Sequence, residues 1–581
     1  MRGDRAVARG GGGEEPGRLE SLLTPLYGAD ARGLARELLC QSLPCQRTGN
    51  GRWDGSTAVL ITYADGVRSP GRPSLAVLDQ VLRSHLAGLF PVLHVLPFLR
   101  ATSDGGFAIC DHERLEPAFG DWSDLAGLGE ERRLMADLVL NHVSSAHRWV
   151  QEFRQGREPG LSRVLAPSGG EGWEAVVRPR SSPLFTTVDT VAGPRPLWTT
   201  FGPDQVDLDW RNPAVLRAFV AQMDRLLAHG VRWFRLDAVG FLWKEPHTPC
   251  LHHPAVHTLV RALRLVLEAR DPTGVLLSET NVPEEENLSY LRSGDEAHLA
   301  YNFPLPPLLL EALLTGHGDL LNRWLARWPA LPPGTALLNF AASHDGVGLR
   351  PLEGLMPPDR LLHLLRACEE RGGLVSHRRR ADGTDSPYEI NIAWWSAMGE
   401  PGGDGRGEGP HQLARFLCGQ LLLLALPGIP AFYLPALLAS GNDRRAHAAS
   451  GQRRDLHRER FALEPLERRL ADPATPAARI LAALRRALTV RGMLPALHPE
   501  APMVCLSAGR SDRVLLRRGE GREALWTAHN LTARTLSLPL GEFAGGAGAE
   551  RGWVDRLGGR VFSGGAVVLE PYGVRWLQQD R

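Results

Sequence analysis

The chain has 581 residues, and its 66 lysines and arginines nearly balance 65 aspartates and glutamates, for a formal net charge of +1. This balance excludes the basic stripe that a nucleic-acid backbone demands. No apolar run approaches the roughly 18 residues of a membrane span, and the segment RGGGGEEPG lacks the apolar core of a secretion signal. We expect a cytoplasmic protein that binds neither nucleic acid nor membranes.

The cysteines are odd in number, scattered and without a CxxC pair, which argues against a disulfide framework and against a zinc site. They are Cys40, Cys45, Cys110, Cys250, Cys368, Cys418 and Cys505. We expect reduced thiols. The basic residues are nearly all arginine, and Lys244 is the only lysine in the chain.

Short apolar runs alternate with longer amphipathic stretches from about residue 56, after an arm (1–16) expected to be disordered and an N-terminal helical segment (17–55). The runs are AVLITY (58–63), PVLHVLPF (91–98), RLMADLVLNH (133–142), VRWFRLDAV (231–239), GVLLSET (274–280), HLAYNF (298–303), TALLNFAASH (335–344) and GIPAFYL (428–434). Such runs are typical of strands buried on both faces of a parallel sheet. Eight of them predict an α/β chain with a closed (β/α)₈ barrel, built from residues 56–142 and 207–495.

Two intervals between these runs are too long for a single helix. The interval after the third run predicts an inserted subdomain over residues 143–206, rich in Pro, Arg, Gly and aromatic residues. The interval between the seventh and eighth runs contains GEPGGDGRGEGP (399–410), which we interpret as a flexible loop. From residue 496 to 581 short alternating runs bounded by Gly and Pro predict a small antiparallel β domain.

Ionisable residues follow several of the apolar runs, where a parallel barrel gathers its chemistry at the carboxyl ends of the strands. The third run ends in Asn141 and His142, the fourth delivers Arg235 and Asp237, the fifth Glu279, and the seventh His344 and Asp345. Any one of these carboxylates could instead cap the following helix, at about even odds. Three of them beside Arg and His on one rim favour a catalytic site.

Glycoside cleavage needs this set of groups. One carboxylate attacks the anomeric carbon and another protonates the leaving oxygen, through an oxocarbenium-like transition state. A third carboxylate can hold sugar hydroxyls, and crowding of like charges raises at least one pKa and so supplies the acid. Arg235, two residues before Asp237 on the same strand face, is expected to keep Asp237 ionised and oriented.

The segments RLDAVG (235–240), DLVLNH (137–142), the strand end at Glu279 and FAASHD (340–345) resemble the four signature regions of glycoside hydrolase family 13, the α-amylase family. Further segments, among them SDGGF (103–107), RPR (178–180), WTTFGPDQVDLDW (198–210) and LWKE (242–245), resemble its sucrose phosphorylase subfamily. ETNVP (279–283), DEAH (295–298), PYEIN (387–391) and GIPAFY (428–433) resemble most the glucosylglycerate phosphorylase branch, whereas sucrose phosphorylases tend to have Gln where Glu389 stands.

The resemblance implies roles for these positions. Asp237 would be the nucleophile, Glu279 the general acid/base and Asp345 the stabiliser of the transition state. Four further residues would bind the glucosyl ring in the −1 subsite, namely Asp104, His142, Arg235 and His344. His457 and the segment KEPHTPC (244–250) depart from the pattern of the relatives, and both lie in the acceptor region, so they bear on acceptor identity and not on glucosyl chemistry.

A phosphorylase must bind inorganic phosphate where a hydrolase binds water, which calls for fixed cationic donors. The candidates are Arg178, Arg180 and Arg458, each with a solvated surface arginine as the alternative. We expect Lys244 to contact a hydroxyl or carboxylate of the acceptor, and Glu389 to accept from acceptor hydroxyls. No metal or organic cofactor is expected, and phosphate would be a co-substrate.

The function expected from these observations is a retaining α-glucoside phosphorylase that moves glucose between a small α-glucoside, glucosylglycerate-like or sucrose, and phosphate. The alternatives are a sucrose phosphorylase proper and an α-glucoside hydrolase or transglucosidase. A barrel that has lost catalysis and serves as a binding module is disfavoured, because a scaffold has no physical reason to cluster three carboxylates.

Overall fold

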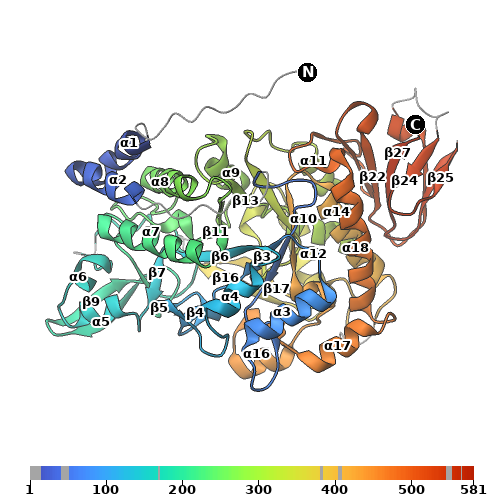
Figure 1. Cartoon of the computed structure of the whole chain (residues 1–581). Helices are drawn as coiled ribbons and strands as arrows, with labels where there is room; N and C mark the ends of the chain where they lie inside the picture. Colours follow the sequence, from blue (N-terminus) through green and yellow to red (C-terminus); the bar gives the residue numbers. More distant parts are fainter. Residues whose placement is uncertain are drawn as a thin grey trace.

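The computed structural model describes residues 15–40, 51–167, 171–379, 384–403, 408–544, 552–563 and 565–580. Eight parallel strands close into a barrel at its centre (Figure 1). In chain order they are β1 (Val59–Thr62), β3 (Val92–Val95), β6 (Arg133–Val139), β11 (Val231–Asp237), β12 (Val275–Ser278), β13 (Leu299–Tyr301), β14 (Ala336–Phe340) and β18 (Ile429–Tyr433). Each neighbours the next, and β18 pairs with β1 to close the ring. All eight predicted runs are barrel strands, which confirms the expected fold.

Helices follow the strands and cover the barrel. The longer ones are α3 (Ser74–His85), α7 (Pro213–Ala228), α8 (Pro254–Arg270), α10 (Leu305–Thr315), α12 (Pro358–Glu369), α14 (Gln412–Ala425) and α18 (Pro476–Met493). Helix α7 is an example of a capped helix with one buried face. The Asn212 side chain accepts from the backbone of Ala214 at its N-terminus, and Val215, Phe219 and Met223, each one turn apart, are buried on a single face.

The predicted subdomain after the third barrel strand is present. Its short strand β10 (Gln205–Asp207) pairs antiparallel with β7 (His142–Ser144), which leaves the barrel directly after β6. A hairpin of β8 (Phe185–Thr190) and β9 (Gly193–Trp198) and the helices α5 (Arg148–Arg154) and α6 (Gly160–Arg163) complete it. The pairing of β7 with β10 brings the subdomain back to the carboxyl rim of the barrel.

The interval between the seventh and eighth barrel strands folds more regularly than the sequence suggested. It contains a three-stranded antiparallel sheet of β15 (Val347–Gly348), β17 (Asp385–Asn391) and β16 (Leu374–Arg379). Strand β17 carries Glu389 to the rim. Within the Gly-rich segment 399–410, for which the sequence predicts a flexible loop, residues 404–407 lie outside the described residues.

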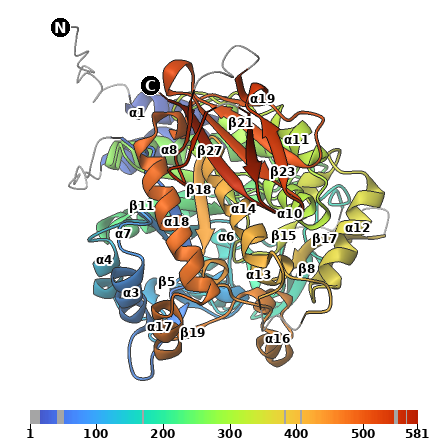
Figure 2. The same cartoon turned by 90° about the vertical axis from the view of Figure 1, so that its right-hand side faces the viewer.

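The C-terminal part is an antiparallel β structure, as predicted, and lies beside α14 and α18 (Figure 2). Its six-stranded sheet has the order β20 (Met503–Cys505), β21 (Arg513–Arg518), β22 (Leu525–Asn530), β27 (Val574–Gln579), β24 (Trp553–Asp555) and β25 (Val561–Phe562). A second, two-stranded sheet pairs β23 (Leu536–Pro539) with β26 (Ala566–Leu569). The side chain of Arg518 joins this domain to the barrel by donating to the carbonyl of Ala425 at the end of α14.

At the other end of the chain, α1 (Glu15–Tyr27) and α2 (Ala31–Cys40) fall in the expected helical segment and lie against α8. The hydroxyl of Tyr27 donates to the carbonyl of Trp210 over 3.0 Å. Residues 1–14 of the predicted arm and residues 41–50 lie outside the described residues, whereas 15 and 16 belong to α1.

Six cysteines lie in the described part of the chain and are free thiols, whereas Cys45 falls outside it. Among the described residues, no helix is long and apolar enough to cross a membrane. Within the same ranges no group of three or more His, Cys, Asp or Glu side chains is placed to hold a metal ion.

Candidate active site

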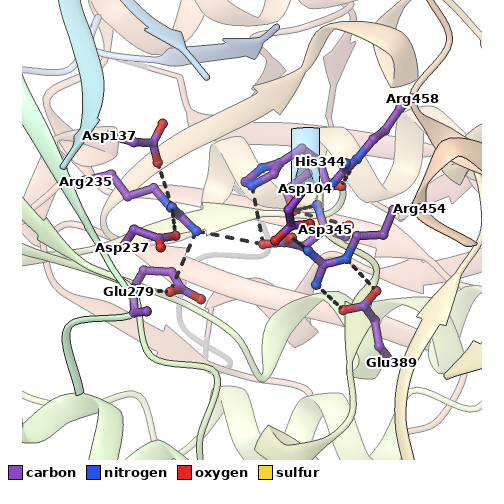
Figure 3. A network of polar contacts seen from close by, with 12 residues as sticks. Asp104, Asp137, Arg235, Asp237, Glu279, His344, Asp345, Glu389, Arg454 and Arg458 are labelled. Carbon is purple, nitrogen blue, oxygen red and sulfur yellow. Dashed lines mark hydrogen bonds and ion pairs between the residues drawn. The ribbon is translucent and has the colours of Figure 1, made fainter. Parts of the chain in front are cut away.

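The guanidinium of Arg235 lies at the centre of a cluster of carboxylates on the carboxyl rim of the barrel (Figure 3). Its Nη1 is 2.6 Å from Asp237 Oδ1 at the end of the same strand. Its Nη2 is 3.8 Å from Glu279 Oε2 and 3.9 Å from Asp345 Oδ2. The structure therefore brings the three predicted catalytic carboxylates within 4 Å of one cation, which balances part of their charge.

A fourth carboxylate, that of Asp137, also fixes the position of the Arg235 guanidinium. Asp137 on β6 accepts from Arg235 Nη1 over 2.6 Å, and its other oxygen lies 2.9 Å from His94 Nε2 on β3. Burial acts to raise the pKa of Asp137, but His94 and Arg235 outweigh it and hold the pKa below its usual range. An ionised, fully buried Asp137 fixes the direction in which Arg235 presents its remaining N–H groups.

The protonation states of Asp237 and Glu279 differ because their surroundings differ. Burial raises the pKa of Asp237 to about 6 and that of Glu279 to about 7, against the charge of Arg235, which lowers both. Arg235 is 2.6 Å from Asp237 but 3.8 Å from Glu279. A single proton shared by the two groups therefore lies on Glu279 and leaves Asp237 ionised.

Asp345 carries a firmly negative charge. Its Oδ1 lies 2.7 Å from Nη1 of Arg454, on the short helix η5 (Arg453–His457), and its Oδ2 lies 3.5 Å from His344 Nε2. Burial acts to raise the pKa of Asp345, but the neighbouring cations, Arg454 foremost, hold it far below the usual range. Burial also lowers the pKa of His344 well below its usual value, so that the ring is neutral.

The residues expected to bind the glucosyl ring form one connected group. Gln205 Nε2 donates to Asp104 Oδ2 over 3.0 Å and lies 3.0 Å from His142 Nε2. The ring of His344 stacks on Phe107, with centroids 5.2 Å apart and planes at 9°. Asp104 has a φ of 52° at the start of the turn η2 (Asp104–Gly106), a backbone conformation that side chains rarely adopt. The turn thus directs this carboxylate toward the subdomain, where it meets Gln205.

Arg458 lies on the same side of the site, close to that turn. Its Nε donates to the carbonyl of His344 over 2.9 Å, and its guanidinium stacks over Tyr63 at 5.4 Å. A Cβ atom on Gly105 would come within 2.7 Å of Arg458 Nη1, so glycine is required there for space as well as for its φ of 63°. Arg458 is buried, and its Nη2 has no hydrogen-bond partner among the described residues.

The other two predicted phosphate ligands differ in their surroundings. Arg180 is half-buried with its guanidinium 5.9 Å over the ring of Tyr388, the neighbour of Glu389, so it lies on the Glu389 side of the site. Arg178 is half-buried, and its Nε and Nη2 have no partner among the described residues. Burial lowers the pKa of Arg178. The contacts of the described residues do not connect Arg178 to the carboxylate cluster.

Lys244 differs from the expectation. Its ammonium lies 2.6 Å from Asp207 Oδ2, 2.6 Å from Asn141 Oδ1 and 2.5 Å from the carbonyl of Phe241. Since an ammonium has three N–H donors, all of them are used within the protein. The interpretation of Lys244 as an acceptor ligand is corrected: it joins the subdomain strand β10 to the residue before His142, where a planar guanidinium could not make the same three contacts.

Comparison with known proteins identifies the family to which the chain belongs. Residues 89–315 match the family model described as the alpha amylase catalytic domain. The chain is 39% identical to the glucosylglycerate phosphorylase of Allomeiothermus silvanus, covering 95% of this chain and 96% of that one. The chain belongs to the α-amylase family.

Other similar proteins are phosphorylases of the same family. A glucosylglycerate phosphorylase from Escherichia coli is 34% identical over 90% of this chain and 92% of its own length. A sucrose phosphorylase from Agrobacterium vitis is 30% identical, covering 71% of this chain and 86% of the relative. The crystal structure of a sucrose 6F-phosphate phosphorylase from Thermoanaerobacter thermosaccharolyticum superposes with a TM-score of 0.69 at 24% identity, over 83% of this chain and 95% of that one, and so shares the fold.

Sequence reasoning missed four contributors to this α-amylase-family site. Gln205 and Asp137 lie within two of the segments that resemble the family, WTTFGPDQVDLDW and DLVLNH, but the sequence alone predicts no role for either. Asp137 is two residues before Val139, the last residue of β6, a spacing that puts both side chains on the same face of the strand. His94 and Arg454 had no such signal: one is a single polar residue in an apolar run, the other one arginine among many.

Proposed function

We propose that this protein is a retaining α-glucoside phosphorylase that transfers glucose reversibly between a small α-glucoside and inorganic phosphate, giving α-glucose 1-phosphate. In the proposed reaction Asp237 attacks the anomeric carbon while Glu279 protonates the leaving oxygen. Glu279 then takes a proton from the incoming phosphate as the glucosyl-enzyme bond breaks. Asp345 would hold ring hydroxyls and offset the positive charge that develops on the ring.

The observation that carries this proposal is the placement of three carboxylates around Arg235, with only one of them bonded closely enough to be kept ionised by it. Arg235 is 2.6 Å from Asp237 and 3.8 Å from Glu279, and the pKa of Glu279 is raised by burial to about 7. A nucleophile must be ionised and an acid protonated at the same pH, and this difference in environment supplies both.

We propose a glycerate-type acceptor, because the relatives called glucosylglycerate phosphorylases, from A. silvanus, Spirochaeta thermophila and E. coli, are 39%, 35% and 34% identical over most of the chain. The sucrose phosphorylase from A. vitis is 30% identical over a smaller share. The half-buried Arg180, whose guanidinium lies 5.9 Å over the ring of Tyr388, offers N–H donors to an anionic acceptor. Arg458 Nη2 is a second such donor.

The proposed reaction needs no metal or organic cofactor, because carboxylates alone carry out the bond changes. Activity should therefore survive exhaustive chelation, and a strict requirement for an added metal ion would contradict this part. A cytoplasmic location is also part of the proposal, supported by six unpaired cysteines in the described part of the chain.

The test is reverse phosphorolysis from α-glucose 1-phosphate with D-glycerate, glycerol, fructose and fructose 6-phosphate as acceptors, measured as phosphate release. We expect D-glycerate to be the best acceptor, ahead of glycerol by about ten- to a hundredfold, because a charge-assisted hydrogen bond is worth roughly 1.5–3 kcal/mol. Fructose as the best acceptor would make the enzyme a sucrose phosphorylase. Release of phosphate at the same rate without any acceptor would make it a hydrolase.

A further inference from the structure

Arg454 contacts both halves of the site at once. Its Nη1 lies 2.7 Å from Asp345 Oδ1, while its Nη2 and Nε lie 2.8 Å and 3.2 Å from the two oxygens of Glu389 (Figure 3). The second contact is a two-point guanidinium–carboxylate pair, which fixes direction as well as distance. One side chain thus fixes a carboxylate of the glucosyl side and a carboxylate of the acceptor side in a single arrangement.

The charges of these three residues present a problem for an anionic acceptor. The Glu389 side chain is only 3% exposed, and burial acts to raise its pKa, but the charge and hydrogen bonds of Arg454 keep the pKa below its usual range. Glu389 is therefore ionised beside an acceptor region that must receive phosphate. Asp345, Glu389 and Arg454 together carry one net negative charge. Without the charge of Arg454, the two carboxylates carry two negative charges. In a partly buried site this difference acts strongly on a nearby anion.

We propose that Arg454 is a positioning residue that makes the site tolerant of anionic acceptors, by neutralising Glu389 while it holds Asp345 in place. The inference rests on the proposed function, since it concerns how phosphate and a glycerate-type carboxylate are accepted. Glu389 keeps oxygen lone pairs for acceptor hydroxyls but no longer repels the acceptor's charge. Arg454 itself need not touch the substrate.

Other charged groups face the same region and also act on the pKa values of Glu389 and Arg454. Arg180 lies over Tyr388 and also acts to lower the pKa of Glu389, but after Arg454. Asp104 acts to raise the pKa of Arg454, after Asp345 and Glu389. In the described part of the chain, Arg454 is thus the one residue that forms ion pairs with both Asp345 and Glu389, which makes it the place to test.

The test compares acceptors of different charge with one neutral donor, α-glucosyl fluoride, so that only the acceptor's charge varies. Fluoride leaves, the acceptor oxygen bonds to the anomeric carbon, and Glu279 takes the acceptor's proton. Transfer to D-glycerate and to inorganic phosphate is measured against transfer to glycerol, and hydrolysis without acceptor reports the glucosyl side alone. The ratio of anionic to neutral transfer cancels any loss of turnover common to all acceptors.

Arg454→Met is expected to lower the anionic-to-neutral ratio by about tenfold or more, since each tenfold change corresponds to about 1.4 kcal/mol. Arg454→Lys, which keeps the charge, should restore most of the ratio. Adding Glu389→Gln to Arg454→Met should restore it as well, because the unbalanced carboxylate is gone. Glu389→Gln alone, an isosteric change, should raise the ratio above that of the wild type.

Arg270→Met is the matched control, because Arg270 is buried and its Nε lies 2.7 Å from Asp224 in an ion pair away from the site. The anionic-to-neutral ratio of this variant should match that of the wild type.

An anionic-to-neutral ratio unchanged in Arg454→Met and in Glu389→Gln would overturn the inference, and so would an equal change in Arg270→Met. If Arg454→Met does not fold, Glu389→Gln decides. If the wild type does not use D-glycerate, the proposed acceptor fails, and the phosphate-to-glycerol ratio still tests Arg454.

Discussion

The backbone N–H of Ala238 donates to Glu279 Oε2 over 3.0 Å. Ala238 directly follows Asp237 and has a φ of 51°, so the chain turns sharply after the barrel strand β11. This turn aims the N–H at the neighbouring strand end, where Glu279 stands. The turn that follows Asp237, the proposed nucleophile, thereby also fixes one oxygen of Glu279, the proposed acid/base, and leaves its other oxygen for the proton that the leaving group needs.

The pH dependence of the first half-reaction follows from the two raised pKa values. Asp237 must be ionised, which fails below about 6, and Glu279 must be protonated, which fails above about 7. We expect a bell-shaped profile of kcat/KM for a glucosylglycerate donor, with its maximum between these values. The donor kcat/KM excludes the titration of phosphate. Full activity that persists two pH units above the maximum would contradict the assignment of Glu279.

Asp237→Asn should remove nearly all turnover, by three orders of magnitude or more, because an amide of the same volume is a poor nucleophile. The fold should be retained, since Arg235 keeps its contact to Asp137. Steady-state rates and circular dichroism measure the two effects. Activity within about tenfold of the wild type would end the assignment of Asp237.

Glu279→Gln should lose turnover in a way that depends on the leaving group. Fluoride leaves without protonation, so α-glucosyl fluoride should still form the glucosyl-enzyme, whereas glucosylglycerate should not. The comparison is made by single-turnover rates with both donors. An equal loss for the two donors would show that Glu279 does not act as the acid.

Lys244→Met should destabilise the protein and leave acceptor preference unchanged. The substitution leaves Asp207 buried without its ion-pair partner, and breaking a buried pair costs about 3–5 kcal/mol. Denaturant unfolding checks the stability, and the D-glycerate-to-glycerol ratio checks the preference. A stable variant that had lost D-glycerate specifically would restore Lys244 as an acceptor ligand.

The barrel and its carboxylates could be predicted from the sequence because both depend on local pattern. A buried parallel strand is a continuous apolar run, and residues directly after such a run must lie on the carboxyl rim, as Asp237 and Glu279 do. The partner of Lys244 could not be predicted, because Asp207 reaches it through the pairing of β10 with β7, a contact fixed by tertiary folding.

The role of Arg454 could not be predicted from the sequence either, because it too depends on contacts that tertiary folding makes. Its role depends on Asp345 and Glu389, which are 109 and 65 positions away in the chain, and on a sheet, β15–β17–β16, that the sequence did not predict. In a chain rich in arginine, residue type alone does not separate a buried, doubly paired guanidinium from a solvated one. Only the folded geometry identifies it.

The most direct test of the account is phosphorolysis of 2-O-α-glucosyl-D-glycerate, followed by NMR in the presence and absence of inorganic phosphate. The account predicts that α-glucose 1-phosphate and D-glycerate form in equal amounts, with retention at the anomeric carbon, and that almost no reaction occurs without phosphate. Free glucose as the main product in both conditions, or β-glucose 1-phosphate as the product, would contradict it.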